Sequence, residues 1–308
     1  MSKMSDKVIV ITGASDGIGE AAARSLKAQG THVVLVGRSP EKTKKVASEL
    51  DAPYYLADFA KLDDVRKLAA QLKRDFPRID VLANNAGGVM GTKRMLSVDG
   101  HELTMQVNYL AAFLLTSLLL DTLIASQATI IATSSIAHMG AGKLDLDDLE
   151  FEHGYTMQKA YGRAKLMDIL FTKELNRRYD AQGIAAAAFH PGVVRTSFSS
   201  EFGGGWSFVY TSFLKHLLIS PAEGADTLVW LATSEPRKDW KPGEYYVKRK
   251  IAKSSPQSQD PKLAHDLWEK SAKLLSINET PELSGGLAQS TTLRPRDRIE
   301  IKRSQVRD

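Results

Sequence analysis

The chain has 308 residues, of which 43% are hydrophobic and 25% are charged, and its formal net charge is +5. This composition suits a large α/β domain with an ample buried core. Much of the positive excess lies beyond residue 248, and no arginine-rich stripe with interleaved aromatic residues is present, which argues against nucleic-acid binding. The absence of cysteine excludes disulfides, thiolate catalysis and cysteine-bound metals.

The most apolar stretch is YLAAFLLTSLLLDTLIA, residues 109–125. Asp121 interrupts it, and it falls short of the roughly 20 apolar residues that a membrane span needs, so we interpret it as a buried helix. The first apolar run, KVIVIT, begins at residue 7, which is too early and too short for a signal peptide. The sequence therefore predicts a soluble, cytoplasmic protein without a transmembrane segment.

Short β-branched runs alternate with longer helical patterns through most of the chain. Predicted strands occupy residues 7–12, 32–37, 53–58, 79–84, 128–133, 184–191 and 243–247. Predicted helices occupy residues 18–29, 40–50, 61–75, 101–125, 157–180 and 221–233. Strands that are apolar on both faces and separated by helices indicate a parallel sheet covered on both sides. Right-handed crossovers then favour a doubly wound α/β fold, the Rossmann fold, as a single domain over residues 1–248.

Two segments depart from this alternation. Residues 198–219 contain a glycine run and the aromatic side chains Phe198, Phe202, Trp206, Phe208, Tyr210 and Phe213. A connection of this length is usually functional, and we predict a substrate lid there. Residues 249–308 form a basic, polar C-terminal extension, in which KLAHDLWEKSAKLL (262–275) predicts one helix and the final residues predict disorder.

The sequence TGASDGIG, residues 12–19, directly follows the first predicted strand. Glycines at 13, 17 and 19 permit a tight turn and let backbone N–H groups approach a pyrophosphate at the start of a helix. The alternative is a glycine-rich turn that binds nothing. The position after the first strand of an alternating chain favours dinucleotide binding over that alternative.

The glycine spacing resembles the TGxxxGxG signature of the short-chain dehydrogenase/reductase family. Further motifs stand where that family has them, over roughly residues 7–247: Asp58, NNAG (84–87), Asn108, SS (134–135), YGRAK (161–165) and HPGVVRT (190–196). The stretches LDLDDLEFE, FTKELNRRY and HPGVVRT resemble the retinol-dehydrogenase-like branch. The sequence shows no apolar N-terminal anchor like that of the membrane-associated members of this branch, which argues against a retinoid substrate.

The resemblance implies a nicotinamide dinucleotide cofactor and a set of residues that contact it. They are Gly13, Ser15, Gly17, Ile18, Gly19, Arg38, Asp58, Phe59, Asn85, Ala86, Gly87, Tyr161, Lys165, Pro191, Gly192, Val194 and Thr196. Gly37 stands where NAD-preferring members carry an aspartate, and Arg38 offers a planar cation to a 2′-phosphate. We therefore expect NADP(H), although Asp16 occupies a position that is basic in some NADP-binding members.

Tyr161 and Lys165 lie one turn apart in a predicted helix, which alone is weak evidence for catalysis. By resemblance, Tyr161 is the general acid/base, and the Lys165 charge lowers its pKa and also holds the nicotinamide ribose. The resemblance assigns Ser135 to orient the carbonyl and leaves Ser134 as a strand-end hydrogen-bonding residue. Asn108 holds a water in the proton relay or, alternatively, is a satisfied core asparagine.

The insert between Ser135 and Tyr161 is expected to shape the substrate pocket, with His138 as a candidate lining residue. His190 is interpreted as a packed or backbone-bonded residue rather than a base. No histidine cluster has metal-ligand spacing, and no metal is expected.

These observations predict an NADP(H)-dependent oxidoreductase that interconverts a carbonyl and an alcohol on an apolar or aromatic small molecule. Reduction of an activated C=C bond is the alternative within enzymes, and a non-catalytic NADP(H)-binding sensor or scaffold is the alternative outside them. The complete set of Asn108, Ser135, Tyr161 and Lys165 argues against the non-catalytic alternative. The resemblance also implies a homodimer or homotetramer built on helices 101–125 and 157–180.

Overall fold

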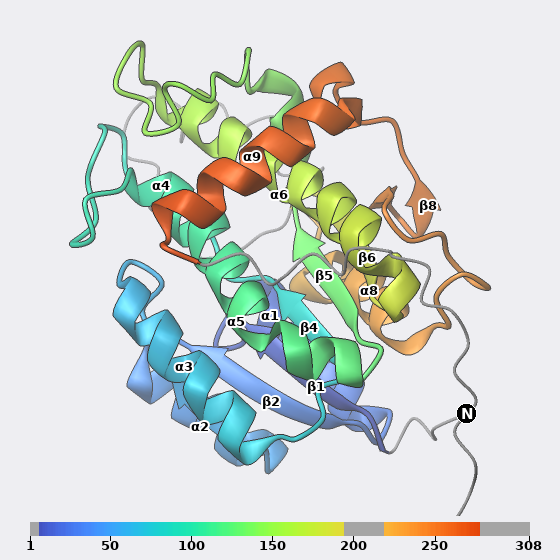
Figure 1. Ribbon diagram of the computed structural model, residues 1–308. Helices are drawn as coiled ribbons and strands as arrows, with labels where there is room; N and C mark the ends of the chain where they lie inside the picture. The colour runs from blue at the N-terminus through green and yellow to red at the C-terminus, as the bar shows by residue number, and fades with distance from the viewer. Residues whose placement is uncertain (1–5, 194–218, 278–308) are drawn as a thin grey trace, which may run out of the picture. The chain divides into compact units, whose positions relative to one another are not determined.

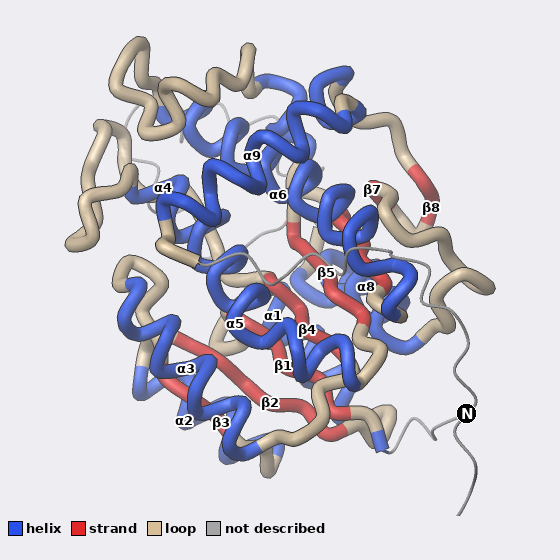
Figure 2. The backbone as a smooth tube through the Cα atoms, in the orientation of Figure 1, coloured by secondary structure: helices blue, strands red, loops and turns tan. Residues whose placement is uncertain are grey.

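The computed structural model of the chain describes residues 6–193 and 219–277. Within them, eight strands form one sheet in the order β3-β2-β1-β4-β5-β6-β7-β8. Figure 2 shows the strands in red between the blue helices. The strands are β1 Val8–Thr12, β2 His32–Gly37, β3 Tyr54–Leu56, β4 Val81–Asn84, β5 Thr129–Thr133, β6 Ala185–His190, β7 Tyr245–Val247 and β8 Lys250–Ile251. All neighbours from β3 to β7 pair in parallel, and β8 pairs antiparallel with β7. The predicted doubly wound parallel sheet is confirmed.

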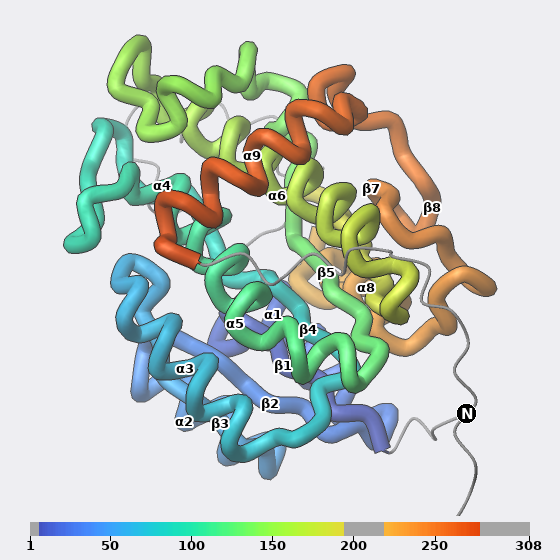
Figure 3. Tube along the Cα trace, in the orientation of Figure 1, coloured from blue at the N-terminus to red at the C-terminus, as the bar shows by residue number. Residues whose placement is uncertain are grey.

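Helices cover both faces of this sheet (Figures 1 and 3). One face carries α1 Gly17–Ala28, α2 Pro40–Leu50 and α8 Pro221–Thr233; the other carries α3 Leu62–Asp75, α5 Ala111–Ala125, α6 Met157–Tyr179 and α9 Pro261–Leu274. Successive side chains of β1 alternate between the faces, so Ile9 and Ile11 pack under α1 and Val10 packs under the other layer. Because both faces are covered, the strands are apolar throughout, which is the pattern that predicted them.

The helical stretch from residue 103 to 125 is the core helix of the second layer. It consists of α4 Leu103–Met105, a π-helical turn η2 Gln106–Leu110 and α5. By length and composition it could cross a membrane, so the predicted shortfall in length is wrong. Its predicted burial is confirmed, since 72% of its most apolar window lies inside the fold. A helix that is apolar all around must be covered on all sides, and here protein provides the cover.

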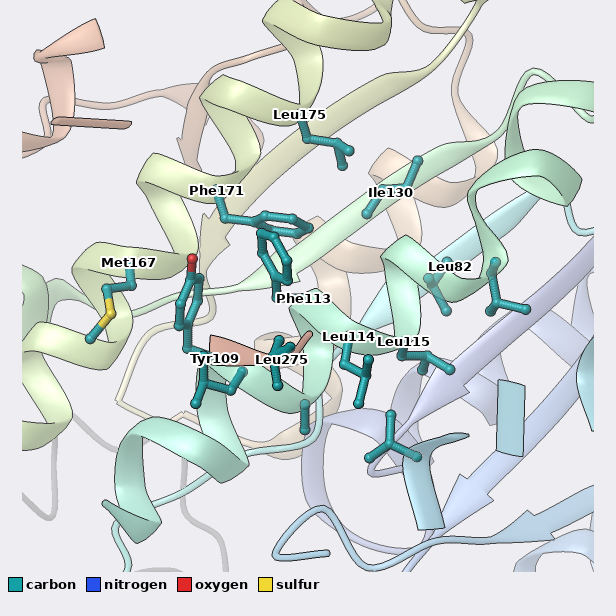
Figure 4. Close-up of a cluster of buried hydrophobic side chains, with 14 of the residues drawn as sticks. Leu82, Tyr109, Phe113, Leu114, Leu115, Ile130, Met167, Phe171, Leu175 and Leu275 are labelled. Atoms are coloured by element: carbon teal, nitrogen blue, oxygen red, sulfur yellow. The ribbon is translucent and has the colours of Figure 1, made fainter. Parts of the chain in front are cut away.

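The C-terminal helix α9 corrects the predicted domain boundary. Trp268 stacks on Phe171 of α6, with ring centroids 5.7 Å apart, and contacts Phe113 of α5 edge-on at 4.8 Å. The Tyr109 hydroxyl lies 2.8 Å from Ser271 Oγ on α9, and Figure 4 shows Tyr109, Phe113 and Phe171 gathered in this cluster. The compact unit therefore extends to Ile277 rather than ending at 248, because α9 buries its apolar face in the same core.

The position of α9 bears on two other predictions. The helix predicted over 262–275 is confirmed, and it lies across α5 and α6 (Figure 1). The resemblance implies association through α5 and α6, and the homo-oligomer stays a prediction. The predicted lid lies outside the described residues except for Ile219, whose N–H donates to Val193 O at 3.0 Å.

We expect Trp268→Ala to lower the free energy of unfolding by about 3–5 kcal/mol, because it leaves a cavity between α9, α5 and α6. Denaturant unfolding measures this loss. Lys262→Ala, at a side chain of α9 that is 82% exposed, is the control and should change stability by less than about 0.5 kcal/mol. A loss below about 1 kcal/mol for Trp268→Ala would contradict the assignment of α9 to the cooperative core.

Candidate active site

The loop after β1 brings backbone rather than side chains to the carboxyl edge of the sheet. Gly13 and Gly17 have positive φ angles of 67° and 56°, which glycine adopts without strain. A Cβ atom at Gly19 would lie 2.2 Å from the Gly13 carbonyl oxygen, so only glycine fits there. The chain therefore turns directly into α1, and the N-terminus of α1 favours an anion at this edge.

Thr12 ties the glycine loop to the end of the neighbouring strand β4. Its Oγ1 donates to the Ala83 carbonyl at 3.2 Å and accepts from the N–H groups of Asn85 (2.9 Å) and Ala86 (3.0 Å). Asn85 in turn donates to the Thr12 carbonyl at 3.0 Å and accepts from Thr133 Oγ1 at 3.1 Å. These bonds hold the ends of β1, β4 and β5 in fixed relation.

The described cofactor-site candidates all lie at the carboxyl ends of strands or in the helix α6 behind them. They are Gly13, Ser15, Gly17, Ile18 and Gly19 after β1, Arg38 after β2, Asp58 and Phe59 after β3, Asn85, Ala86 and Gly87 after β4, Pro191 and Gly192 after β6, and Tyr161 and Lys165 on α6. Val194 and Thr196 lie outside the described residues. The strand order reverses between β1 and β4, and a doubly wound sheet binds its ligand outside such a reversal.

A side chain has no room at the end of β2. A Cβ atom at Gly37 would lie 2.2 Å from Thr43 Oγ1 and 3.1 Å from Ser15 Cβ. Thr43 is buried, and its hydroxyl donates to the Ser39 carbonyl at 2.6 Å in the first turn of α2. The close packing of α2 on β2 therefore requires glycine at 37, and the next residue, Arg38, is exposed.

Lys165 is a buried ammonium held by two partners. Its Nζ donates to the Thr133 carbonyl at the end of β5 at 2.8 Å and to Asp168 Oδ2 at 3.0 Å. It lies 5.6 Å from the centroid of the Tyr161 ring. Burial opposes the charge on Lys165, but Asp168 and Tyr161 outweigh it, so the pKa of Lys165 lies above its usual value. Burial raises the pKa of Asp168 to about 6, although Lys165 opposes this rise.

Asn108 is brought next to Lys165 by Gly87. A Cβ atom at Gly87 would lie 2.5 Å from Asn108 Oδ1 and 3.4 Å from Lys165 Nζ. The Asn108 amide accepts from Gly88 N–H at 2.9 Å and donates to the carbonyls of Gly88 (2.7 Å) and Thr104 (2.8 Å). Both amide hydrogens are thus used, as in a satisfied core asparagine, and Oδ1 keeps one lone pair for a water. The π-helical turn that carries Asn108 is a feature found frequently at functional sites.

Ser134 and Ser135 have different hydrogen-bond partners, and Ser134 is the strand-end hydrogen-bonding residue that the sequence predicts. Ser134 is buried, and its hydroxyl donates to the Lys165 carbonyl at 2.7 Å, which joins the end of β5 to α6. Ser135 begins the short helix η3 Ile136–Gly140, and its Oγ accepts from Ala137 N–H at 3.2 Å. A Cβ atom at Gly162 would lie 2.7 Å from the Ala137 carbonyl, so this glycine lets η3 approach α6 beside Tyr161. Ser135, Tyr161 and Lys165 therefore lie on two elements in close contact.

Asp168 is the site residue that the sequence reasoning missed. It lies three residues after Lys165 on the same helical face, so the spacing alone places the carboxylate near the ammonium. That spacing is common on exposed helices, where such pairs contribute little. Burial of both side chains distinguishes this pair, and only the packed structure reveals it.

A parallel doubly wound sheet, a glycine turn leading into α1 and a buried lysine beside a tyrosine define a dinucleotide-binding oxidoreductase. Within the described residues, no group of three or more His, Cys, Asp or Glu side chains could hold a metal ion.

Comparison with known proteins agrees with this class. The sequence profile described as short chain dehydrogenase matches residues 7–204. The chain belongs to this family, in its retinol-dehydrogenase-like branch.

Two relatives and one solved structure show how far the similarity extends. A proposed daunorubicin C-13 ketoreductase, DnrU of Streptomyces sp. (strain C5), is 41% identical over 86% of this chain and 91% of its own. Retinol dehydrogenase 13 of Homo sapiens is 37% identical over 90% of this chain and 86% of its own. A protein of Escherichia coli CFT073, described as a short chain dehydrogenase complexed with NADPH, has a TM-score of 0.62 and 27% identity over 80% of this chain and 98% of its own.

Asp168→Asn should lower the pKa of Lys165, because burial then acts on the ammonium without its carboxylate. The ¹³Cε chemical shift of Lys165 against pH measures the change. Asp147→Asn, at a side chain that is 99% exposed, is the matched control. A Lys165 pKa that stays above its ordinary value in Asp168→Asn would show that Asp168 does not maintain the charge.

Proposed function

We propose that this protein is an NADP(H)-dependent oxidoreductase that interconverts a carbonyl and an alcohol on an apolar or aromatic small molecule. The observation that carries the proposal is the buried Lys165 ammonium beside the Tyr161 ring. An ammonium has three hydrogens, and Thr133 and Asp168 use two of them. The third can bind a ribose hydroxyl at the carboxyl edge, where a dinucleotide lies in this fold.

The residues present fit a dinucleotide by the chemistry of their donors. The N-terminus of α1 favours a pyrophosphate, Lys165 a ribose, and the Arg38 guanidinium a 2′-phosphate. A bound nicotinamide would supply the hydride for carbonyl reduction and accept it in the reverse direction.

In this proposal, the Tyr161 phenol donates its proton to the carbonyl oxygen as reduction proceeds, or takes the proton of the alcohol in reverse. A phenol with a pKa near 10 is a poor acid–base catalyst at neutral pH. The adjacent Lys165 charge stabilises the phenolate that donation leaves behind. Ser135 holds the carbonyl oxygen by a hydrogen bond, and Asn108 offers its remaining Oδ1 lone pair to a water that returns the proton.

Apolar side chains around the proposed centre support an apolar substrate. Ile136 and Met139, in the helix that begins at Ser135, are each 49% exposed, and Val193 after β6 is 37% exposed. Such side chains are unfavourable in water and would be covered by an apolar ligand. The two relatives are named for a ketone and for retinol, which agrees with carbonyl and alcohol chemistry.

The cofactor preference rests on the end of β2. Gly37 leaves no carboxylate to repel a 2′-phosphate, and Arg38 lies exposed beside it. Asp16 is an acidic residue where some NADP-binding members carry a basic one, which weakens this expectation. In the structure, the Asp16 carboxylate forms an ion pair with Lys42, with Oδ2 and Nζ 2.8 Å apart, and this cation partly offsets its negative charge. The NADPH bound to the Escherichia coli protein supports the same preference.

Arg38→Ala should lower the ratio of kcat/KM with NADPH to kcat/KM with NADH by about 10- to 150-fold. A hydrogen bond to a charged group contributes about 1.5–3 kcal/mol, which corresponds to that factor. Steady-state kinetics with both cofactors measure the ratio. Lys73→Ala, at an exposed residue of α3, is the control. Equal use of NADH and NADPH by the wild-type protein at low salt would contradict the role of Arg38. Gly37→Asp is not a clean test, because its side chain would displace Thr43.

Tyr161→Phe keeps the ring but removes the proton donor, so we expect turnover to fall at least about 10²-fold while NADPH still binds. The assay mixes protein and NADPH with aldehydes, ketones, quinones and activated alkenes, and follows nicotinamide absorbance. Turnover confined to the alkenes would favour C=C reduction, and NADPH binding without turnover would favour a sensor. Near-normal activity in Tyr161→Phe would place the acid elsewhere.

A further inference from the structure

His138 is a buried imidazole with both ring nitrogens in hydrogen bonds. Its Nδ1 lies 2.6 Å from the carbonyl oxygen of Ser135, and its Nε2 lies 3.1 Å from the backbone nitrogen of Ser255. The ring also contacts Tyr245 edge-on, with centroids 5.0 Å apart. His138 therefore joins the helix η3 to the segment that follows β8, more than a hundred residues later in the chain.

The partners determine which tautomer His138 adopts. A backbone N–H can only donate, so Nε2 must accept the bond from Ser255. The single proton of a neutral imidazole is then on Nδ1, from which it donates to the Ser135 carbonyl. Burial lowers the pKa of His138, although the bond to Ser135 opposes this, and the neutral form is favoured.

The segment that supplies the Ser255 N–H is itself firmly anchored. Gln257 donates from Nε2 to the Gly142 carbonyl at 2.7 Å and accepts from Leu144 N–H at 2.8 Å. Ser258 is fully buried, and its hydroxyl donates to the Ser255 carbonyl at 2.6 Å. The helix η7 Pro256–Gln259 then leads into α9, which packs in the main core. The position of the Ser255 N–H is thus fixed from both sides.

We propose that His138 is a positioning residue for Ser135, and that the Ser255 N–H selects the tautomer with which His138 holds the Ser135 carbonyl. This inference rests on the proposed function, in which Ser135 orients the substrate carbonyl. The C-terminal part of the chain would then act on the reaction through one buried imidazole. Ser255 contributes its backbone N–H to this arrangement and acts on Ser135 through His138.

The first test removes the Ser255 N–H from the network. Ser255 has φ −61°, close to the value that proline imposes, so Ser255→Pro deletes the donor without a change of φ, and the proline Cδ takes the place of the hydrogen and displaces the His138 ring. We expect kcat to fall about 10- to 100-fold, as for a reacting group misplaced by up to about 1 Å, with KM for NADPH unchanged. Ser255→Ala is the matched variant, because it keeps the N–H and removes a hydroxyl with no partner among the described residues. It should retain the wild-type tautomer of His138.

The second test separates the two bonds of His138 and does not depend on a proline folding correctly. The amide nitrogen of asparagine lies near the position of Nδ1, whereas the glutamine amide reaches that of Nε2. His138→Asn should therefore retain more of the wild-type kcat than His138→Gln or His138→Phe. Equal kcat in the Asn and Gln variants, or wild-type kcat in both, overturns the proposal. His32→Asn, at an exposed residue at the start of β2, is the control.

Nitrogen-15 NMR of histidine-labelled protein reads the tautomer directly. We expect the Nδ1–H form for His138 in the wild-type and Ser255→Ala proteins, and loss of that signature in Ser255→Pro. An Nε2–H form in the wild-type protein overturns the proposal. Failure of the proposed function is recognised separately, as absence of wild-type turnover with every carbonyl compound tested. The NMR measurement tests the His138 hydrogen bonds whether or not the protein turns over these compounds.

Discussion

The burial of the Lys165 charge is the constraint on which the site depends. A buried ammonium is costly unless hydrogen bonds and an opposite charge compensate it. The Thr133 carbonyl serves as one partner, at the last residue of β5. Asp168 provides the opposite charge from the same helix. Lys165 can reach Thr133 only if α6 has the right position along the end of β5. The Ser134 hydroxyl, which donates to the Lys165 carbonyl, fixes the position of α6 relative to β5.

Residues of α9 and of the segment before it help to fix the position of α6, although they lie far away in the sequence. Trp268 of α9 stacks on Phe171 of α6, and the Tyr109 hydroxyl in the π-helical turn is hydrogen-bonded to Ser271 of α9. The preceding segment reaches back to η3 through His138 and to the loop before α6 through Gln257. The two elements that carry Ser135 and Tyr161 are thus supported from the same side. A chain that ended at residue 248 would leave apolar surface of α5 and α6 exposed to water.

Glycines mark the places where elements approach too closely for a side chain. Gly37 admits α2, Gly87 admits Asn108, and Gly162 admits η3. Each lies beside a residue of the proposed site, because a site at a sheet edge needs several elements to converge. The absence of a carboxylate at 37, which suggests NADP(H) from the sequence, is therefore also a packing requirement. The two explanations are compatible, since the same glycine makes room for Thr43 and leaves Arg38 beside an uncharged strand end.

The sequence by itself determined the alternation of elements, the parallel sheet and the order of the motifs. These follow from local patterns: apolar strands, amphipathic helices and glycines after a strand, each readable within a few residues. Every predicted strand and helix in the described residues lies within two residues of its observed bounds. Tertiary structure alone decided that α9 belongs to the core, that the Lys165–Asp168 pair is buried and that His138 meets Ser255. The contacts of α9 and of His138 join residues that are far apart in the chain, where no periodic pattern relates them. The Lys165–Asp168 spacing is readable in the sequence, but the burial that makes this charge pair matter is a property of the packed molecule.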